Sequence, residues 1–492
     1  MLNNEQARSR RPRRKLQRAV RKNALFVLLS VALVATLYLV NTKRQTTGAS
    51  GRIAIVGARL IDMTGGGVIE DSILVIGDGR IEAVGRGRDR SATRGTRVID
   101  GTGCTVLPGL IDCDVHLISG SGGSAMSVTE FMPERIASDL RGSLYWGITT
   151  LRDGGDSLNI SLRYRDRLKD DGVAHPRFYA SGPWITARGG YPALYLPPLV
   201  ASDVTRQIES QTDLTRTMDE LTDKSVDMLE VAYEGGSDWK PYPKLSFSTL
   251  IDIVARARAR GLRVSAVTRS NWELKEALQA GVTAVEHISA ERLDEDCIKL
   301  LLDKQAYYCP SLALRYSEMA SSEEIDALLA TPDVRNTVGA RIVESLSEHK
   351  GYFFEVKEDK MGFGYMQEVW RNSQANLKMV TERGVKVILG TGAGSPAVFH
   401  GLAPHDELRL MLAAGMPAME ALKSATRSAA EFIGLDKQIG TLEAGKQADI
   451  LVVDGNPLED IGATKRNRLV LRDGMEVDRG ALLQSPSSPD QP

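Results

Sequence analysis

The sequence predicts an α/β fold: a (β/α)8 barrel of the TIM type, joined to a small β-domain that both ends of the chain build. Two observations predict it. Between residues 108 and 436, apolar runs typical of strands alternate with amphipathic stretches typical of helices, and eight such units close a parallel barrel. On either side, at 52–107 and 437–480, strand-like runs follow one another with Gly and Asp turns between them. A chain of 492 residues, 42% of them hydrophobic, can bury both cores.

The N-terminal segment predicts a membrane anchor. Residues 1–22 contain nine Lys or Arg residues and one acid, Glu5, and the following run "ALFVLLSVALVATLYLV" at 24–40 has no charge. This run is just long enough for a helix that spans a bilayer, which needs about 17–25 residues. We expect a basic tail at 1–23, a single transmembrane helix at 24–40 and a polar linker at 41–51. The positive-inside rule places the tail in the cytoplasm and the rest on the periplasmic side of a bacterial inner membrane.

Two other interpretations of this segment are weaker. A cleaved signal peptide needs small residues directly after the apolar run, and "YLVNTKRQ" lacks them. A basic arm that binds nucleic acid would explain residues 1–22, but the adjoining apolar run makes membrane topology the simpler explanation. The net charge of -1 gives the whole chain no attraction to nucleic acid. We therefore expect an uncleaved anchor and no nucleic-acid partner.

The β-domain is expected as a sandwich in two parts. The first part, 52–107, contains "RIAIVGARLID", "SILVIGDGRIEAVG" and "TRVIDGTGCTVLPG", and its "GDGR" at 77–80 indicates a tight hairpin. The second part, 437–480, contains "ADILVVDG" and "NRLVLRDGMEV", which are likewise apolar strand-like runs that end in Gly and Asp turns. The last residues, 481–492, are rich in Ser and Pro and predict a disordered tail.

The barrel is expected at 108–436. Its strand-like runs include "GITTLRD", "VDMLEVAYEGG", "GLRVSAVT", "GVTAVEHIS", "AYYCPSLAL" and "GVKVILGTGAG". Helices such as "FSTLIDIVARARARG" and "NWELKEALQAG" lie between them and end at glycine. This order is typical of a parallel barrel, whose functional groups lie at the C-terminal ends of the strands.

The four cysteines are widely spaced and contain no C-x-x-C pair, so they indicate neither a disulfide framework nor a zinc ribbon. We expect them to be packing residues, although an exported protein could form one bridge. In the strand "GLIDCDVHL", alternation places Asp112, Asp114 and His116 on the inner face. It places Cys113 and Val115 on the outer face, toward the helices.

Several phrases carry a family resemblance. They include "VLPGLIDCDVHL", "GITTLRDGG", "GVTAVEH", "GVKVILGTGAG" and "IGTLEAGKQADILVVDGNPLEDI". From residue 53 to about 478 the chain resembles the amidohydrolase superfamily, in the group of imidazolonepropionase and prolidase-like enzymes. The resemblance implies metal-dependent hydrolysis of C–N bonds, in which one or two divalent ions, usually zinc, activate a water molecule at the barrel mouth.

The resemblance also implies a ligand set, which this chain keeps only in part. The family uses His-x-His on strand 1, a carboxylated Lys on strand 4, His on strands 5 and 6, and an Asp on strand 8 that is both ligand and base. Here His116 and His287 match the family pattern, while Asp114 and Glu230 place shorter carboxylates where it has His and Lys. We expect any remaining metal ligands among these four residues.

Two positions of the pattern have no ligand. The strand 5 histidine falls at Val267, or at Thr268 if the register shifts by one, and the strand 8 aspartate falls at Gly392. A histidine of the substrate loop is replaced by Tyr191. Arg269 follows strand 5, and a cationic side chain there could pair with Asp114 or Glu230 in place of a metal.

Three interpretations of the site remain open. The favoured one is a dismantled metal site in a protein that binds a small amide-like ligand or has a structural role. The second is an active hydrolase with one divalent ion, most plausibly zinc, in which Asp114 or Glu230 serves as base. The third is acid–base catalysis by these two carboxylates without metal. The cofactor is thus none or one divalent metal, and the sequence gives no oligomeric state.

Overall fold

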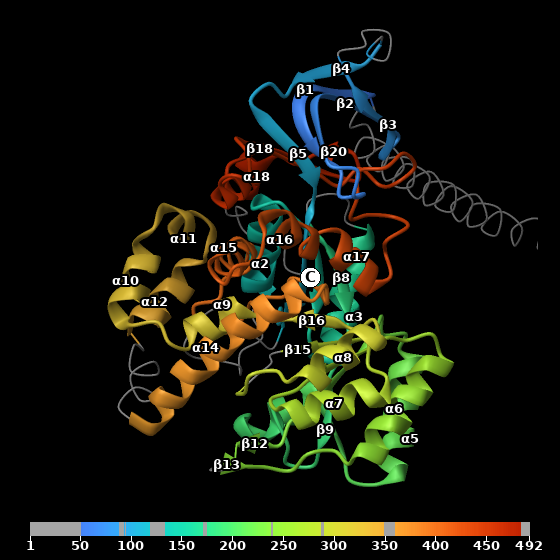
Figure 1. Cartoon of the computed structure of the whole chain (residues 1–492), viewed down its shortest axis with the longest axis vertical. Coiled ribbons are helices and arrows are strands. Elements are labelled where there is room, and N and C mark those ends of the chain that lie inside the picture. Colours follow the sequence, from blue (N-terminus) through green and yellow to red (C-terminus); the bar gives the residue numbers. More distant parts are fainter. Residues whose placement is uncertain are drawn as a thin grey trace, which may run out of the picture. The chain divides into compact units, whose positions relative to one another are not determined.

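The structure is a computed structural model of the whole chain, shown in Figure 1. It describes residues 51–483 apart from 88–92, 94, 119–132, 171–174, 238–239, 287–289 and 349–359. The expected basic tail, the anchor at 24–40, nearly all of the linker and the last nine residues lie outside this part, so they stay predictions. Among the residues that are described, no helix is long and apolar enough to cross a membrane.

Strands from both ends of the described chain share one mixed sheet in the order β20-β19-β18-β5-β1-β2-β3, with β4 paired to β1. Their bounds are β1 Ile53–Ile61, β2 Val68–Gly77, β3 Arg80–Arg86, β4 Arg97–Asp100, β5 Cys104–Pro108, β18 Ile450–Asp454, β19 Asn467–Arg472 and β20 Met475–Glu476. The expected hairpin at 77–80 is confirmed, because Gly77 pairs with Arg80 across a two-residue turn. The sheet covers a core that includes Ile55, Leu74 and Ile450.

These strands are joined by hydrogen bonds into one continuous sheet, in which β1 changes partners along its length. The register of β1 shifts between Val56 and Ala58 and again before Leu60. Its first half pairs with β4 and its second half with β5, both in parallel. Such bulges bend a strand and let it change partners.

Parallel strands form the barrel. Their bounds are β6 Leu110–Val115, β7 Ile148–Asp153, β8 Arg177–Ala180 with β9 Trp184–Ala187, β11 Leu229–Ala232, β14 Val264–Val267, β15 Ala284–Glu286, β16 Tyr307–Cys309 and β17 Lys386–Val387. Strand β10 (Thr205–Ile208) lies beside β9. The chain after β17 returns to β6, where Cys113 N donates to Leu389 O at 2.9 Å and His116 N to Ala393 O at 2.7 Å. On the other side, Asp227 N donates to Ala180 O at 2.9 Å, so the barrel closes.

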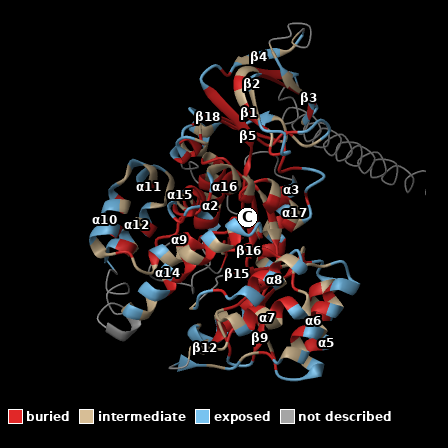
Figure 2. Cartoon of the chain, viewed as in Figure 1, coloured by how far each residue is buried: buried red, intermediate tan, exposed pale blue. Residues whose placement is uncertain are grey.

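Helices surround the strands and turn their buried faces toward them (Figure 2). Their bounds are α2 Pro133–Tyr145, α3 Leu158–Asp170, α4 Pro198–Val204, α5 Gln211–Asp223, α6 Phe247–Ala259, α7 Asn271–Ala280, α8 Glu295–Asp303, α9 Leu312–Ser317, α10 Ser322–Ala330, α11 Pro332–Thr337, α12 Ala340–Glu348, α14 Lys360–Glu382, α15 Ala403–Ala413, α16 Ala418–Ser424, α17 Arg427–Ile433 and α18 Arg479–Leu482. A short 3-10 helix, η3, spans Ile461–Lys465. Helices α5 and α7 begin with capping boxes at Ser210 and Ser270.

The orientation of β6 corrects a second expectation. Cys113 belongs to a buried cluster with residues of several barrel strands and of α17, among them Met228, Cys309 and Phe432, so it faces the barrel interior and not the outer helices. Asp112 instead accepts hydrogen bonds from the backbone N and side-chain Oγ1 of Thr391, at 3.2 and 2.6 Å. The cause is one extra residue in β6 between Asp112 and Val115 relative to β7, which breaks the strict alternation of inner and outer positions.

Candidate functional site

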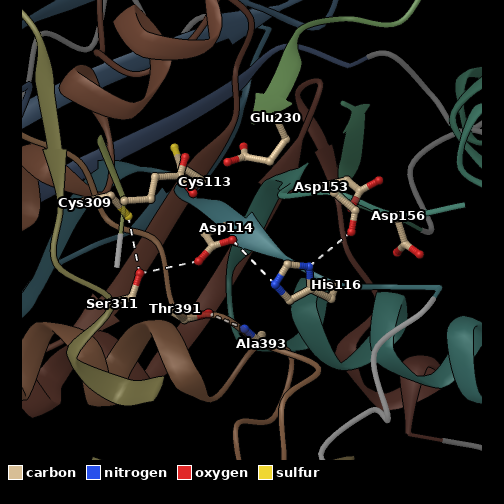
Figure 3. Close-up of polar contacts among 12 residues, drawn as sticks. Cys113, Asp114, His116, Asp153, Asp156, Glu230, Cys309, Ser311, Thr391 and Ala393 are labelled. Carbon is tan, nitrogen blue, oxygen red and sulfur yellow. Dashed lines mark hydrogen bonds and ion pairs between the residues drawn. The ribbon is translucent and has the colours of Figure 1, made fainter. Parts of the chain in front are cut away.

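The end of β6 brings Asp114 and His116 together, as Figure 3 shows. His116 Nε2 lies 3.8 Å from Asp114 Oδ1, and the Ser311 hydroxyl donates to Asp114 Oδ2 at 3.4 Å. The Asp114 side chain is fully buried and that of His116 is 13% exposed. One carboxylate oxygen and one imidazole nitrogen therefore lie close together in largely buried surroundings.

The backbone and an indole ring fix the His116 ring. Its Nδ1 lies 3.4 Å from Gly155 O, and a carbonyl can only accept, so Nδ1 carries the proton in this contact. The Trp184 ring lies 5.0 Å away, centre to centre. The close approach of the indole also requires glycine at position 155, because a Cβ there would collide with the Trp184 ring.

Glu230 lies in the barrel interior, where its partner is Arg152 of β7. Arg152 Nη2 donates to Glu230 Oε2, while Nη1 donates to Glu286 Oε1 at 3.0 Å and to Cys113 O at 3.1 Å. The three charged side chains are essentially inaccessible to solvent. Below them, the Arg152 guanidinium carbon lies 5.7 Å from the centre of the Phe432 ring. We call Arg152, Glu230 and Glu286 the interior ion triad.

The triad has unusual electrostatics. Burial and the neighbouring Glu286 raise the pKa of Glu230 well above its ordinary range, and the Arg152 guanidinium opposes this only in part. Burial disfavours the charge of Arg152, but the carboxylates of Glu286 and Glu230 outweigh it and raise the pKa of Arg152. Arg152 therefore remains a fixed cation among carboxylates that share it.

The structure corrects the expectation for Arg269, which pairs with neither Asp114 nor Glu230. Its Nη1 lies 3.7 Å from Glu234 Oε2, and its Nε donates to the Tyr365 hydroxyl at 2.8 Å. The reason is position: β14 ends at Val267, so Arg269 lies beyond the strand end, whereas Arg152 lies within β7.

The other positions of the expected pattern differ in outcome. Val267 is buried at the end of β14, and its side chain has no atom that can bind a metal. Gly392 has a left-handed backbone with φ +67°, and a Cβ on it would lie 3.1 Å from Leu314 Cδ2. Leu314 thus fills the space where the resemblance places a catalytic aspartate.

His287 lies outside the described residues. Among residues with described positions, no three His, Cys, Asp or Glu side chains are grouped to hold a metal, and metal binding by Asp114, His116, Glu230 and His287 stays a prediction.

Comparison with known proteins decides the family. The family model described as "Amidohydrolase family" matches residues 105–475, which is most of the chain. The chain belongs to the amidohydrolase family. This confirms the resemblance expected from its sequence, and it explains why the barrel and the sheet from both chain ends occur together.

Several known proteins are similar to this amidohydrolase over most of its length. Imidazolonepropionase of Sphingopyxis alaskensis is 28% identical over 444 residues, which cover 82% of this chain and 92% of that enzyme. Ochratoxinase of Aspergillus niger is 24% identical over 459 residues, 83% of each chain. Among solved structures, a Xaa-Pro dipeptidase with bound methionine in the active site superposes with a TM-score of 0.70 at 24% identity, over 86% of this chain and 99% of that one. The likeness to the solved structure shows a shared fold.

A two-metal amidohydrolase site does not fit these residues. A carboxylate that bridges two ions must have both oxygens available, and Oε2 of Glu230 is bonded to Arg152. Gly392 stands at the position where the family has its base, and Leu314 packs against it. Among the members of the expected ligand set that the structure describes, Asp114 and His116 retain the geometry of two neighbouring ligands.

Sequence reasoning missed three residues of the site: Arg152, Glu286 and Leu314. A signal existed for the first two. Arg152 is a charged residue inside the apolar run "GITTLRD", and Glu286 directly precedes His287 in "AVEHIS". A charge inside a buried strand requires an opposite charge nearby, so the two residues could have been considered as partners. Nothing local in the sequence shows that Leu314 packs against Gly392, which follows it by 78 positions.

Proposed function

We propose that this amidohydrolase is a membrane-anchored, ligand-binding protein that has given up metal-dependent hydrolysis of C–N bonds. The observation that carries the proposal is the ion pair between Arg152 and Glu230. It uses an internal guanidinium to neutralise the carboxylate that replaces the family's bridging group. The packing of Leu314 against Gly392 supports the same conclusion, because it fills the position of the expected base.

The ligand proposed for the barrel mouth is a small amide-like molecule. Similar proteins have names such as Xaa-Pro dipeptidase, imidazolonepropionase and phenylurea hydrolase B. The mouth of this chain retains polar side chains that could contact such a ligand, among them Arg269, Glu234 and Tyr191. Burial and the neighbouring Glu234 raise the pKa of Tyr191, so its hydroxyl stays protonated and can donate to a carbonyl oxygen.

The membrane location is part of the proposal. It rests on the basic tail and the uncharged run at 24–40, which place the barrel on the periplasmic side of an inner membrane. A reporter enzyme fused after residue 50 that is active only in the periplasm supports this topology. Activity of that fusion in the cytoplasm contradicts it.

A second candidate function is hydrolysis with one divalent ion. The observation that favours it is the 3.8 Å separation of His116 Nε2 and Asp114 Oδ1. In that case Asp114 and His116 would hold the ion, with His287 as a further donor, and the metal would activate a water molecule.

Metal analysis of the purified full-length chain separates the two candidates. The protein is incubated with excess zinc, passed over a desalting column and analysed for zinc, beside His116→Ala. We expect the wild type to hold well under about 0.2 zinc ions per chain, and the variant to match it. About one zinc per chain, lost in His116→Ala, overturns the proposal and supports the hydrolase.

Ligand binding needs its own measurement. A panel of dipeptides and aryl amides is screened by thermal unfolding of the wild type, and each stabilising compound is recovered and analysed by mass spectrometry. We expect at least one compound to raise Tm and to be recovered intact. Hydrolysis of a stabilising compound, abolished in His116→Ala, contradicts the non-catalytic assignment.

A further inference from the structure

The Arg152 guanidinium is buried and surrounded by oxygen atoms, as a bound metal cation would be. We infer that its guanidinium occupies an oxygen-lined cage inside the barrel, and that this cage binds a hard divalent cation once the Arg152 side chain is removed. The inference rests on the proposed function, since it takes the wild-type cage to be filled by Arg152.

Oxygen atoms from three barrel strands bond the guanidinium. They are Glu230 Oε2 of β11, Glu286 Oε1 of β15 and the Cys113 carbonyl oxygen of β6. The Ser265 hydroxyl of β14 donates to the same Glu286 oxygen. The guanidinium therefore links strands that lie on different sides of the barrel, as a metal ion would.

Arg152 is the cation of the cage. Glu230 and Glu286 are both essentially inaccessible to solvent, and burial together with Glu286 raises the pKa of Glu230, so the guanidinium and a shared proton hold the two carboxyl groups together. Glu230 Oε1 is buried and accepts no hydrogen bond from any residue with a described position. Removing Arg152 would leave two buried carboxylates without a cation, a state that costs several kcal/mol unless a proton or another cation takes its place.

The ligand atoms select the kind of cation. Carboxylate and carbonyl oxygens are the ligands of Mg²⁺, Ca²⁺ and Mn²⁺, whereas zinc prefers nitrogen and sulfur. Cys113 contributes its carbonyl oxygen to the cage, not its sulfur. The cage thus differs in chemistry from the pair of Asp114 and His116, which includes an imidazole nitrogen.

Space for an ion is created by the substitution itself. Arg152 is the largest of the fully buried side chains among the described residues, so Arg152→Ala leaves a polar cavity large enough for an ion and water molecules. The Phe432 ring, which lies below the guanidinium, closes the cavity on one side.

The test uses Mn²⁺, which the free-ion signal in electron paramagnetic resonance counts directly. Full-length wild type, Arg152→Ala and a control, Arg188→Ala, are equilibrated with Mn²⁺. We expect Arg152→Ala to bind about one ion per chain more than the wild type, and its Tm to rise with Mn²⁺. Arg188→Ala should match the wild type, because Arg188 and its partner Glu209 are largely exposed to solvent.

A triple variant identifies the ligands. Arg152→Ala combined with Glu230→Gln and Glu286→Gln keeps the cavity but removes both charges, and we expect it to lose the added Mn²⁺. Equal binding by Arg152→Ala and the wild type overturns the inference, and so does equal binding by the single and triple variants.

Folding is tested separately, because Arg152→Ala is expected to be unstable without a cation. The variant is refolded from urea with Mn²⁺ or with sodium chloride of equal ionic strength. Recovery of folded protein only with Mn²⁺ supports the inference, and equal recovery or equal failure in both overturns it.

The proposed function and this inference fail on different results. Zinc bound to the wild type would contradict the proposed function, whereas the inference is judged by the difference in Mn²⁺ binding between Arg152→Ala and the wild type.

Discussion

Single side chains decide which parts of the family's chemistry this barrel can keep. At the strand 8 position, Gly392 has φ +67° and Leu314 lies within 3.2 Å of where its Cβ would be. The loss of the aspartate is therefore accompanied by a repacked neighbour and a backbone that disfavours side chains. Restoring one residue would not restore the family's site.

Substitution at Gly392 tests this point. We expect Gly392→Ala to lower the free energy of unfolding by about 2 kcal/mol, since a left-handed backbone costs about 1–2 kcal/mol in a residue with a side chain and Leu314 must shift. Gly392→Asp should lose at least as much, because it also buries a carboxylate. Urea unfolding measures both. The paired change Leu314→Ala with Gly392→Ala should lose less than the sum of the two single changes, and strict additivity contradicts the packing argument.

Among the elements, local patterns predicted well and non-local pairing did not. The β2–β3 hairpin and helices α6 and α7 were predictable because their turn residues, caps and apolar spacing lie within a few residues. The bulge of β6 was not, because it appears only in its pairing with β7. For this reason Cys113 was assigned to the wrong face.

The candidate site follows the same rule. Asp114 and His116 could be paired from sequence, since they lie two residues apart on one strand. The partner of Glu230 could not, because Arg152 precedes it by 78 positions and reaches it only through the closed barrel. Arg269 was chosen instead because it follows the next strand along the chain.

Helix α15 provides a prediction of pH dependence. His405 in its first turn donates from Nε2 to Trp146 O at 3.0 Å, and its Nδ1 lies 2.9 Å from the Thr464 hydroxyl of η3, which itself donates to Ile461 O. Burial, helped by Lys465, lowers the pKa of His405 from 6.5 to about 3. The folded pKa is below the unfolded one, so the stability from neutral His405 is complete above pH 6.5 and is lost as the pH falls toward 3.

We expect this loss to reach about 2 kcal/mol between pH 6.5 and pH 5. The measurement is urea unfolding of the wild type and of His405→Gln, which cannot titrate, across this range. The buried His400 has the same shift and is present in both proteins, so the difference between the two profiles isolates His405. Parallel profiles contradict the prediction.

At the scale of the whole molecule, a cluster of charges joins the barrel to the sheet. Arg177 at the start of β8 donates to Asp449, which lies next to β18, and to Asp473, which lies between β19 and β20. It also donates to Gln447 Oε1 at 2.6 Å. The Arg177 and Asp449 side chains are only 11% and 3% exposed. One buried guanidinium thus bonds three of the sheet residues that return from the C-terminal end of the chain.

Replacing this guanidinium should weaken the whole molecule. We expect Arg177→Met to lower the free energy of unfolding by about 3 kcal/mol, because it leaves the Asp449 carboxylate buried without its cation. Arg188→Met is the matched control: Arg188 pairs with Glu209, but their side chains are 72% and 61% exposed, so its loss should stay below about 0.5–1 kcal/mol. Urea unfolding followed by both far-UV circular dichroism and tryptophan fluorescence measures the two variants. If the cluster couples sheet and barrel, the two signals coincide in the wild type and separate in Arg177→Met. Equal losses in the two variants would show that the cluster adds nothing beyond an exposed ion pair.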